Sequence, residues 1–142
     1  MSWTQGKKVL VPVDFSEPST NAVDQAIEVS GDVGMITVLN VVEPMPAFDY
    51  GAIYNDDIDK AHTTAAINAL EKQFSGEKYK GLSIKTVTGD PAHSIAEYAS
   101  EHDMELIVIP SHGRTGVKRL LIGSVAERVV RLSHCPVLVL RS

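Results

Sequence analysis

The sequence predicts an α/β protein built on a five-stranded, doubly wound parallel sheet. Short apolar runs alternate with segments of helical periodicity along the chain, which is the order expected when helices connect parallel strands. The runs 9–11 and 36–42 are largely apolar on both faces, as strands are when helices cover both sides of their sheet. The length of 142 residues suits one domain with a sizeable core. We therefore expect residues 1–142 to form a single domain.

The first part of the chain is expected to form two strands, one helix and a long loop. A valine-rich strand is predicted over residues 8–13 and a second strand over 35–42. Between them, Pro18 lies in the first turn of a helix that ends at Gly31. The inward-facing residues of this helix, by their spacing, are Ala22, Ala26 and Val29. Residues 43–55 contain two prolines and a glycine, and loops of that length are often lids or binding elements.

The remainder of the chain is expected to supply three further strands and three further helices. The helices are predicted over residues 56–74, from Pro91 onward behind an Asp90 cap, and over 125–132. The strands are predicted over residues 82–88, 106–109 and 136–140. One face of the first of these helices carries Ile58, Ala61, Ala65 and Ala69. The inward face of the next helix carries Ile95, Ala96 and Ala99.

The strand order decides where a ligand would bind. In doubly wound sheets the ligand crevice lies beyond the carboxyl ends of the strands, where the strand order reverses. With the order 3-2-1-4-5, the first and fourth strands flank that point, and their outgoing loops begin at Asp14 and Pro110. Residues 110–124 are therefore expected to lie at the crevice.

This segment is rich in glycine and basic residues and leads into a helix. Backbone N–H groups and the helix dipole favour a phosphate at such a place, and Ser124 offers a hydroxyl for the helix cap or for a phosphate oxygen. The glycines are Gly113, Gly116 and Gly123, and the bases are Arg114, Lys118 and Arg119. The alternative is a surface loop with solvated bases and an ordinary helix cap.

Composition narrows the function classes. The net charge of −5 argues against general affinity for nucleic acids. Cys135 is the only cysteine, so no internal disulfide forms, which fits a reducing compartment. The first residues lack the apolar core of a signal peptide, and no apolar run approaches the roughly 20 residues of a membrane span. We expect a cytoplasmic protein without a membrane partner. Histidines without paired ligand spacing, which argue against a dedicated metal site, are His62, His93, His102 and His134.

Three motifs in this sequence resemble the universal stress protein family, and the resemblance covers nearly the whole chain. The motifs are Pro12-Val13-Asp14-Phe15-Ser16, Leu39-Asn40-Val41-Val42, and a signature from Ser111 through Glu127. In ATP-binding members the signature reads Gly, two residues, Gly, nine residues, then Gly-Ser or Gly-Thr. Here Gly113 and Gly123-Ser124 match, whereas Pro110 stands in place of the first glycine. The resemblance implies the adenine nucleotide alpha hydrolase-like fold.

The resemblance also implies a nucleotide site. The main chains of Val13 and Val41 would hold the adenine edge, and Asp14 would face the ribose or a phosphate-bound Mg²⁺. Ser111, His112 and Gly113 would pass beside the sugar and phosphates, and Gly123, Ser124 and Val125 would present N–H groups to the phosphates. The full expected set is Pro12, Val13, Asp14, Ser16, Val41, Ile109, Pro110, Ser111, His112, Gly113, Arg114, Gly116, Gly123, Ser124 and Val125. The implied ligand is ATP or AMP, with Mg²⁺ present only together with the nucleotide.

Pro110 is the main departure from the signature. Proline has no N–H to donate, and its ring fills space that glycine leaves open. It also holds Ile109 in an extended conformation, which the end of a strand tolerates. If the Pro110 ring crowds the sugar pocket, replacing it with glycine should tighten adenylate binding; the alternative is that the proline is compatible with the site.

The function expected from these features is that of an adenine-nucleotide-binding regulatory protein of the stress response with an unidentified protein partner. The last strand, Val137-Leu138-Val139-Leu140, is an apolar edge and is expected to pair with its copy in a homodimer. One alternative is a dimeric scaffold that binds no nucleotide. Another is a slow ATP hydrolase or adenylyl-transferring enzyme, for which Asp14 and Ser124 are the only candidates. The P-loop spacing is absent, and no catalytic residue is assigned.

Overall fold

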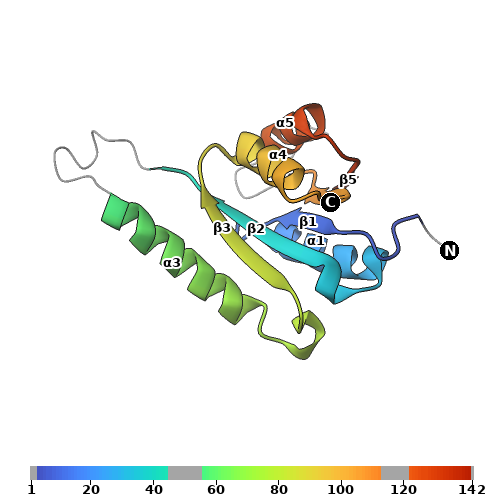
Figure 1. Ribbon diagram of the computed structural model, residues 1–142, viewed down its shortest axis with the longest axis horizontal. Coiled ribbons are helices and arrows are strands. Elements are labelled where there is room, and N and C mark those ends of the chain that lie inside the picture. The colour runs from blue at the N-terminus through green and yellow to red at the C-terminus, as the bar shows by residue number, and fades with distance from the viewer. Residues whose placement is uncertain (1–2, 45–55, 113–121, 142) are drawn as a thin grey trace.

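The computed structural model describes residues 3–44, 56–112 and 122–141, with the backbone alone over 56–59. The strands are β1 (Val9–Pro12), β2 (Ile36–Val42), β3 (Ser83–Thr88), β4 (Leu106–Pro110) and β5 (Val137–Leu140). They form one parallel sheet in the order β3-β2-β1-β4-β5, which confirms the predicted 3-2-1-4-5 topology. Figure 1 shows the sheet with its helices.

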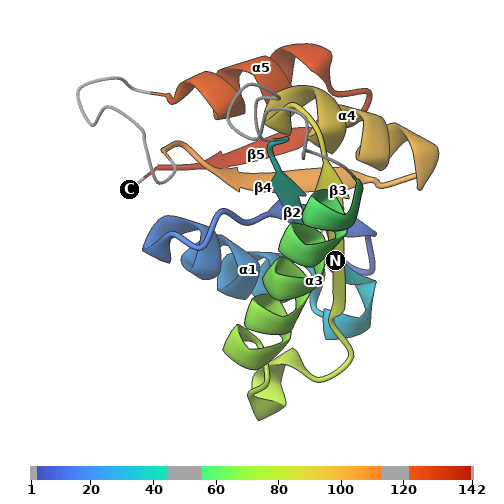
Figure 2. The same cartoon turned by 90° about the vertical axis from the view of Figure 1, so that its left-hand side faces the viewer.

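Helices cover both faces of this sheet, as Figure 2 shows from the side. Helices α1 (Glu17–Ser30) and α3 (Asp56–Gln73) lie on one face, and α4 (Pro91–Glu101) and α5 (Ser124–Leu132) lie on the other. Two short 3-10 turns, η1 (Val33–Met35) and η3 (Glu77–Tyr79), precede β2 and β3.

The side chains of β1 alternate between the two resulting cores. Val9 and Val11 pack among residues of α1 and α3, while Leu10 packs among residues of α4 and α5, and all three are fully buried. This is the burial expected of a strand at the centre of a doubly wound sheet.

The helix boundaries follow the capping residues seen in the sequence. Ser16 caps α1 by accepting the N–H of Ser19 at 3.3 Å, and Gly31 ends it with φ of 76° and an N–H bonded to the Ile27 carbonyl. Asp90 caps α4 by accepting from His93 N–H at 3.0 Å. These local signals fix where the chain leaves and re-enters the sheet.

The inward face of α3 differs from the prediction. Ala61, Ala65 and Ala69 are exposed, and the side chain of Ile58 lies outside the described residues. The buried or half-buried side is instead formed by Thr63, Ala66, Ile67 and Leu70, and continues into Phe74 just beyond the helix. Burying leucine, isoleucine and phenylalanine removes more apolar area from water than burying alanines does, so the larger side chains set the rotation of the helix.

Pro110 lies inside β4, one residue beyond the predicted end of that strand. It pairs with Leu140 in register, and the N–H groups of Ile107 and Ser111 donate to β5. Strand residues direct their main-chain groups alternately to the two neighbours, so the Pro110 nitrogen faces the β1 side. The last residue pair between β1 and β4 is Leu10 with Ile107, so the two strands no longer pair at Pro110. The missing N–H therefore costs no bond of the β-ladder.

Candidate functional site

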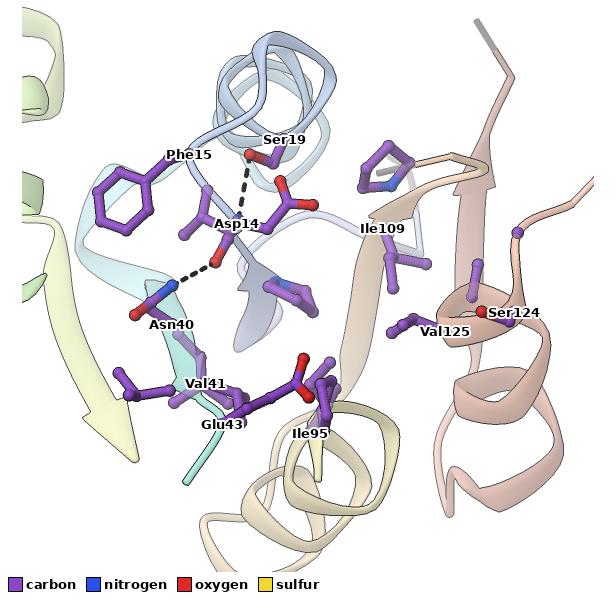
Figure 3. A pocket seen from close by; sticks show the side chains of 18 of the residues that line it. Asp14, Phe15, Ser19, Asn40, Val41, Glu43, Ile95, Ile109, Ser124 and Val125 are labelled. Carbon is purple, nitrogen blue, oxygen red and sulfur yellow. Dashed lines mark hydrogen bonds between the residues drawn. The ribbon is translucent and has the colours of Figure 1, made fainter. Parts of the chain in front are cut away.

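A cleft of about 660 Å³ opens beyond the carboxyl ends of β1, β2 and β4, where the strand order reverses. Figure 3 shows its wall of apolar side chains with a few polar groups among them. Such a volume lies within the range of small-molecule sites. The expected residues that line the cleft are Pro12, Val13, Asp14, Val41, Ile109, Pro110, Ser111, Gly123, Ser124 and Val125.

The other expected residues stand apart from this lining. Ser16 is the cap of α1, and His112 lies beside the cleft with its Nδ1 3.2 Å from Ser111 Oγ. The Nε2 atom of His112 is buried without a hydrogen-bond partner in the described part of the chain. Gly113, Arg114 and Gly116 lie outside the described residues.

The turn after β1 holds Asp14 at the cleft. The Asp14 N–H donates to Ser19 Oγ at 3.4 Å, and one Asp14 carboxylate oxygen accepts from Ser16 N–H at 3.1 Å. Ser19 Oγ in turn donates to the Ser16 carbonyl at 2.9 Å. The helix cap is thus Ser16, and Asp14 supports the turn from within while its side chain lines the cleft (Figure 3).

The ends of β1 and β2 leave main-chain groups of Val41 at the cleft. Val13 N–H donates to the Leu39 carbonyl at 2.9 Å, while Gly89 N–H donates to the Val42 carbonyl at 3.0 Å. Because strand residues alternate in direction, the N–H and C=O of Val41 point toward β1, as those of Leu39 do. β1 has ended by this level, so these two groups face the cleft.

Val13 is engaged differently from Val41. Its N–H is donated to Leu39, and its carbonyl accepts from Asn40 Nδ2 at 2.8 Å, the contact drawn as a dashed line in Figure 3. Of the two main chains expected to hold an adenine edge, Val41 therefore directs both groups into the cleft, whereas Val13 uses its own within the fold.

The opposite side of the cleft is the N-terminus of α5. Gly123 is the cap residue and Ser124 the first helical residue, so the predicted capping role of the Ser124 hydroxyl is wrong. Gly123 N–H donates to the Ser111 carbonyl, and a Cβ on Gly123 would lie 2.9 Å from that oxygen. The N–H groups left without helical partners are those of Ser124, Val125 and Ala126, and all three residues line the cleft.

Charge is unevenly distributed around the cleft. Asp14 and Glu43 contribute carboxylates to the lining, and among the described lining residues there is no lysine, arginine or histidine. The positive end of the α5 dipole, whose first three residues all line the cleft, attracts an anion. An anionic group is therefore favoured at α5, away from the carboxylates of the β1 and β2 ends.

An ion pair joins the two helices on this face of the sheet. Arg128 of α5 lies 3.2 Å from the Asp90 carboxylate at the start of α4. The His93 N–H, and after it Arg128, hold the pKa of Asp90 below its ordinary value. Pro91 and Ile95 of α4 line the cleft, so this pair connects two of its walls.

Within residues 3–44, 56–112 and 122–141, no three histidine, cysteine or acidic side chains gather into a possible metal site. In the same ranges, no helix combines the length and the apolar character needed to cross a membrane.

The model of the universal stress protein family matches residues 6–141. The chain belongs to this family. Universal stress protein MJ0531 of Methanocaldococcus jannaschii is 34% identical over 139 residues, covering 95% of this chain and 82% of that protein. The solved structure of hypothetical protein MJ0577, from the same organism, has a TM-score of 0.80 at 26% identity, with 97% of each chain covered. A universal stress protein solved in complex with cAMP shares the fold, with a TM-score of 0.64 at 22% identity over 94% of this chain and 96% of that one.

The cleft of this universal stress protein includes residues that sequence reasoning missed. The most informative are Phe15, Asn40 and Glu43, and the lining also includes the apolar residues Leu39, Ala66 and Ile95. Asn40 carried a signal, because it is a polar residue near the carboxyl end of an otherwise apolar strand. Nothing in the sequence indicated that Phe15 lines the cleft, because a positive φ at phenylalanine cannot be inferred from the neighbouring residues.

Proposed function

We propose that this universal stress protein is a regulatory protein that binds an adenine nucleotide in the cleft at the sheet's switch point. The observation that carries this proposal is the pairing of two features across one cleft. The main chain of Val41 offers a donor and an acceptor side by side, and the N-terminus of α5 offers unpaired N–H groups opposite. The first suits the edge of a nucleobase and the second suits phosphate.

Different residues of the cleft would bind the base, the phosphates and the ribose of a nucleotide. Val41 N–H and C=O match N1 and the N6 amino group of adenine, which are an acceptor and a donor. The N–H groups of Ser124 and Val125 would hold phosphate, with the Ser124 hydroxyl as a further donor. Asp14 would contact the ribose or a Mg²⁺ ion carried by the phosphates, which neutralises charge between phosphate and carboxylate. ATP and AMP both suit this division.

The solved relative in complex with cAMP supports the same ligand class, because its fold holds an adenine nucleotide. The mass of any small molecule bound to the purified protein distinguishes a nucleotide-binding protein from a scaffold that binds none. We expect native mass spectrometry of the protein purified without added nucleotide to show a bound adenylate. Titration calorimetry should then show ATP or AMP binding more tightly than GTP.

An empty protein that shows no heat with millimolar ATP and Mg²⁺ overturns the nucleotide proposal in favour of a scaffold. Release of ADP or pyrophosphate at a rate proportional to protein concentration would instead favour the slow hydrolase or adenylyl-transferring enzyme. Regulation through an unidentified protein partner, in the cytoplasm and in response to stress, belongs to the same proposal.

The homodimer is proposed from the open edge of β5. This strand ends the sheet, and Leu138 on it is 37% exposed. The carbonyls of Pro136 and Leu140 accept from β4, so alternation turns the N–H and C=O of Val137 and Val139 to the open edge. Antiparallel pairing with the same strand of a second copy would satisfy these groups around a two-fold axis.

Light scattering with two proline variants tests the dimer. Val139→Pro removes an outward N–H and is expected to give a monomer of reduced stability, because the Val139 side chain packs against the core between the sheet and α4 and α5. Leu138→Pro is the matched control, because it removes an N–H that faces β4 and should disturb folding itself. A monomeric parent at micromolar concentration contradicts the dimer.

A further inference from the structure

The β1–β2 ladder stops earlier than its register requires. Val13 N–H donates to the Leu39 carbonyl. In a parallel ladder the next two bonds would run from Val41 N–H to the Val13 carbonyl and from Phe15 N–H to the Val41 carbonyl. Among the described residues neither bond forms. Two side chains explain why both of these rungs are missing.

Asn40 replaces the first missing rung. Its side chain is 5% exposed, and Nδ2 donates to the Val13 carbonyl at 2.8 Å. The carbonyl thus receives a donor without Val41 N–H, and a buried polar group is satisfied as folding requires. The consequence is that Val41 N–H stays available at the cleft.

Phe15 removes the second rung. Its φ of 66° is in the left-handed region, which is uncommon for a bulky side chain and costs free energy that the surrounding structure must supply. The bonds among Asp14, Ser16 and Ser19 hold the turn in place. With this positive φ, the Phe15 N–H does not reach the Val41 carbonyl. The Phe15 residue is 41% exposed and lines the cleft.

Phe15 and Asn40 both line the cleft, and Figure 3 draws them on the side of it that β2 borders. Ala66 of α3 also lines the cleft. An exposed apolar side chain by itself needs no explanation, but one held by an unfavourable backbone angle at a cleft mouth does. Strain of this kind is found where a ligand uses the strained group.

We propose that Phe15 and Asn40 form the nucleobase end of the cleft: Asn40 keeps the Val41 main chain open to the base edge, and the Phe15 ring covers the base face. Phe15 contacts the ligand and is a specificity residue, whereas Asn40 is a positioning residue that acts through Val13 and Val41. This inference rests on the proposed function, and it assigns the base, not the phosphates, to these two side chains.

The Asn40 role is tested with Asn40→Leu and Asn40→His. Leucine is similar in size but has no donor, so the Val13 carbonyl is left to take Val41 N–H and close the ladder by one rung. ATP affinity should fall about fivefold, as for one lost hydrogen bond, while affinity for inorganic tripolyphosphate stays unchanged. Histidine retains an N–H donor and should restore most of the ATP affinity.

The Phe15 role is tested with three variants that separate the ring from the strain. Phe15→Leu keeps the unfavourable angle and loses the ring, Phe15→Asn loses the ring and tolerates the angle, and Phe15→Tyr keeps both. ATP affinity should fall about tenfold in the leucine and asparagine variants and hold in the tyrosine variant. Only asparagine should raise the Tm of the ligand-free protein, by about 3 °C.

The outcomes separate this inference from the proposed function. If the parent protein does not bind ATP, both the proposed function and the assignment of Phe15 and Asn40 to the nucleobase are wrong. A parent that binds ATP while Phe15→Leu and Asn40→Leu bind it equally well removes this inference alone. Equal losses for ATP and tripolyphosphate, or an Asn40→His variant as weak as Asn40→Leu, would show a general structural role and also overturn the assignment.

Discussion

The turn after β1 and the junction between β4 and α5 border the same cleft, but different kinds of contact hold them in place. In the turn, side chains of Asp14, Ser16 and Ser19 exchange hydrogen bonds with the main chain. At the junction, the main chain of Gly123 bonds directly to that of Ser111, with no space for a Cβ between them. The turn is therefore expected to lose stability gradually as hydroxyls are removed, whereas the junction depends on one residue having no side chain.

The junction should give the largest effect. Gly123→Val places a branched side chain against the Ser111 carbonyl, which a Cβ would meet at 2.9 Å. We expect a loss of about 2–3 kcal/mol in the free energy of unfolding, as for overpacking of a filled site, measured by urea denaturation. Because Gly123 also borders the cleft, we expect ATP binding to weaken together with folding.

Gly123→Ala is the graded control for that variant and should lose less stability, because the alanine methyl is smaller. If both variants unfold at the parent's urea midpoint, the junction accommodates a side chain at position 123 without loss of stability. That result would contradict the difference proposed between the two sides of the cleft.

The turn should give an intermediate effect through Ser19. Its hydroxyl is 1% exposed and joins the Asp14 N–H to the Ser16 carbonyl. Ser19→Ala should lower the free energy of unfolding by about 1 kcal/mol, since the partly buried Asp14 N–H loses its Ser19 acceptor. The Ser16 carbonyl keeps the N–H and hydroxyl of Thr20 as donors. Ser75→Ala, which removes an exposed hydroxyl bonded to the Lys72 carbonyl, is the control and should change stability by much less. Equal effects would mean that the turn is not held by its side chains.

Pro110 offers a test in which stability and binding should change in opposite directions. Pro110→Gly should lower the free energy of unfolding by about 0.5–1 kcal/mol, because the unfolded chain gains freedom. Adenylate binding should tighten, since the ring lies at the cleft lining and its nitrogen makes no bond of the ladder. Calorimetric titration of parent and variant measures adenylate affinity, and urea denaturation of the two ligand-free proteins in the same buffer measures the free energy of unfolding. Weaker binding in the variant would show that the ring contributes to the site.

The smallest effect concerns the Asp90–Arg128 pair that joins α4 and α5. The folded pKa of Asp90 lies below its ordinary value of 3.8, first because of the His93 N–H and then because of Arg128. Its contribution to stability is therefore present above pH 3.8 and is lost as pH falls through the lower folded pKa. Asp90→Asn should remove this part of the acid dependence and leave the rest of the unfolding profile in place. A variant whose stability declines with acid as steeply as the parent's contradicts the pair's role.

The helix limits and the alternation of strands with helices were accessible from the sequence because they depend on short-range patterns. Pro18, Gly31 and Asp90 mark helix ends through local backbone chemistry. The face of α3 was not accessible, because two sets of residues at helical spacing compete, and the packing partners choose between them. The same limit applied at Ser124, where the true cap, Gly123, is selected by its contact with Ser111.

The sequence by itself determined the alternation of strands and helices, and with it a doubly wound sheet, because periodicity and turn residues act within a few positions of one another. Periodicity does not fix the strand order, since the same alternation is compatible with other orders of a doubly wound sheet, and the order β3-β2-β1-β4-β5 is a property of the assembled sheet. Only the tertiary structure decided which main-chain groups and side chains the cleft presents to a ligand. The open main chain of Val41 depends on Asn40 reaching Val13, which lies 27 residues away in the chain. The exposed ring of Phe15 depends on a backbone angle that the neighbouring turn enforces. Hydrogen bonds between distant strands arise from register, and register is settled only when the sheet assembles.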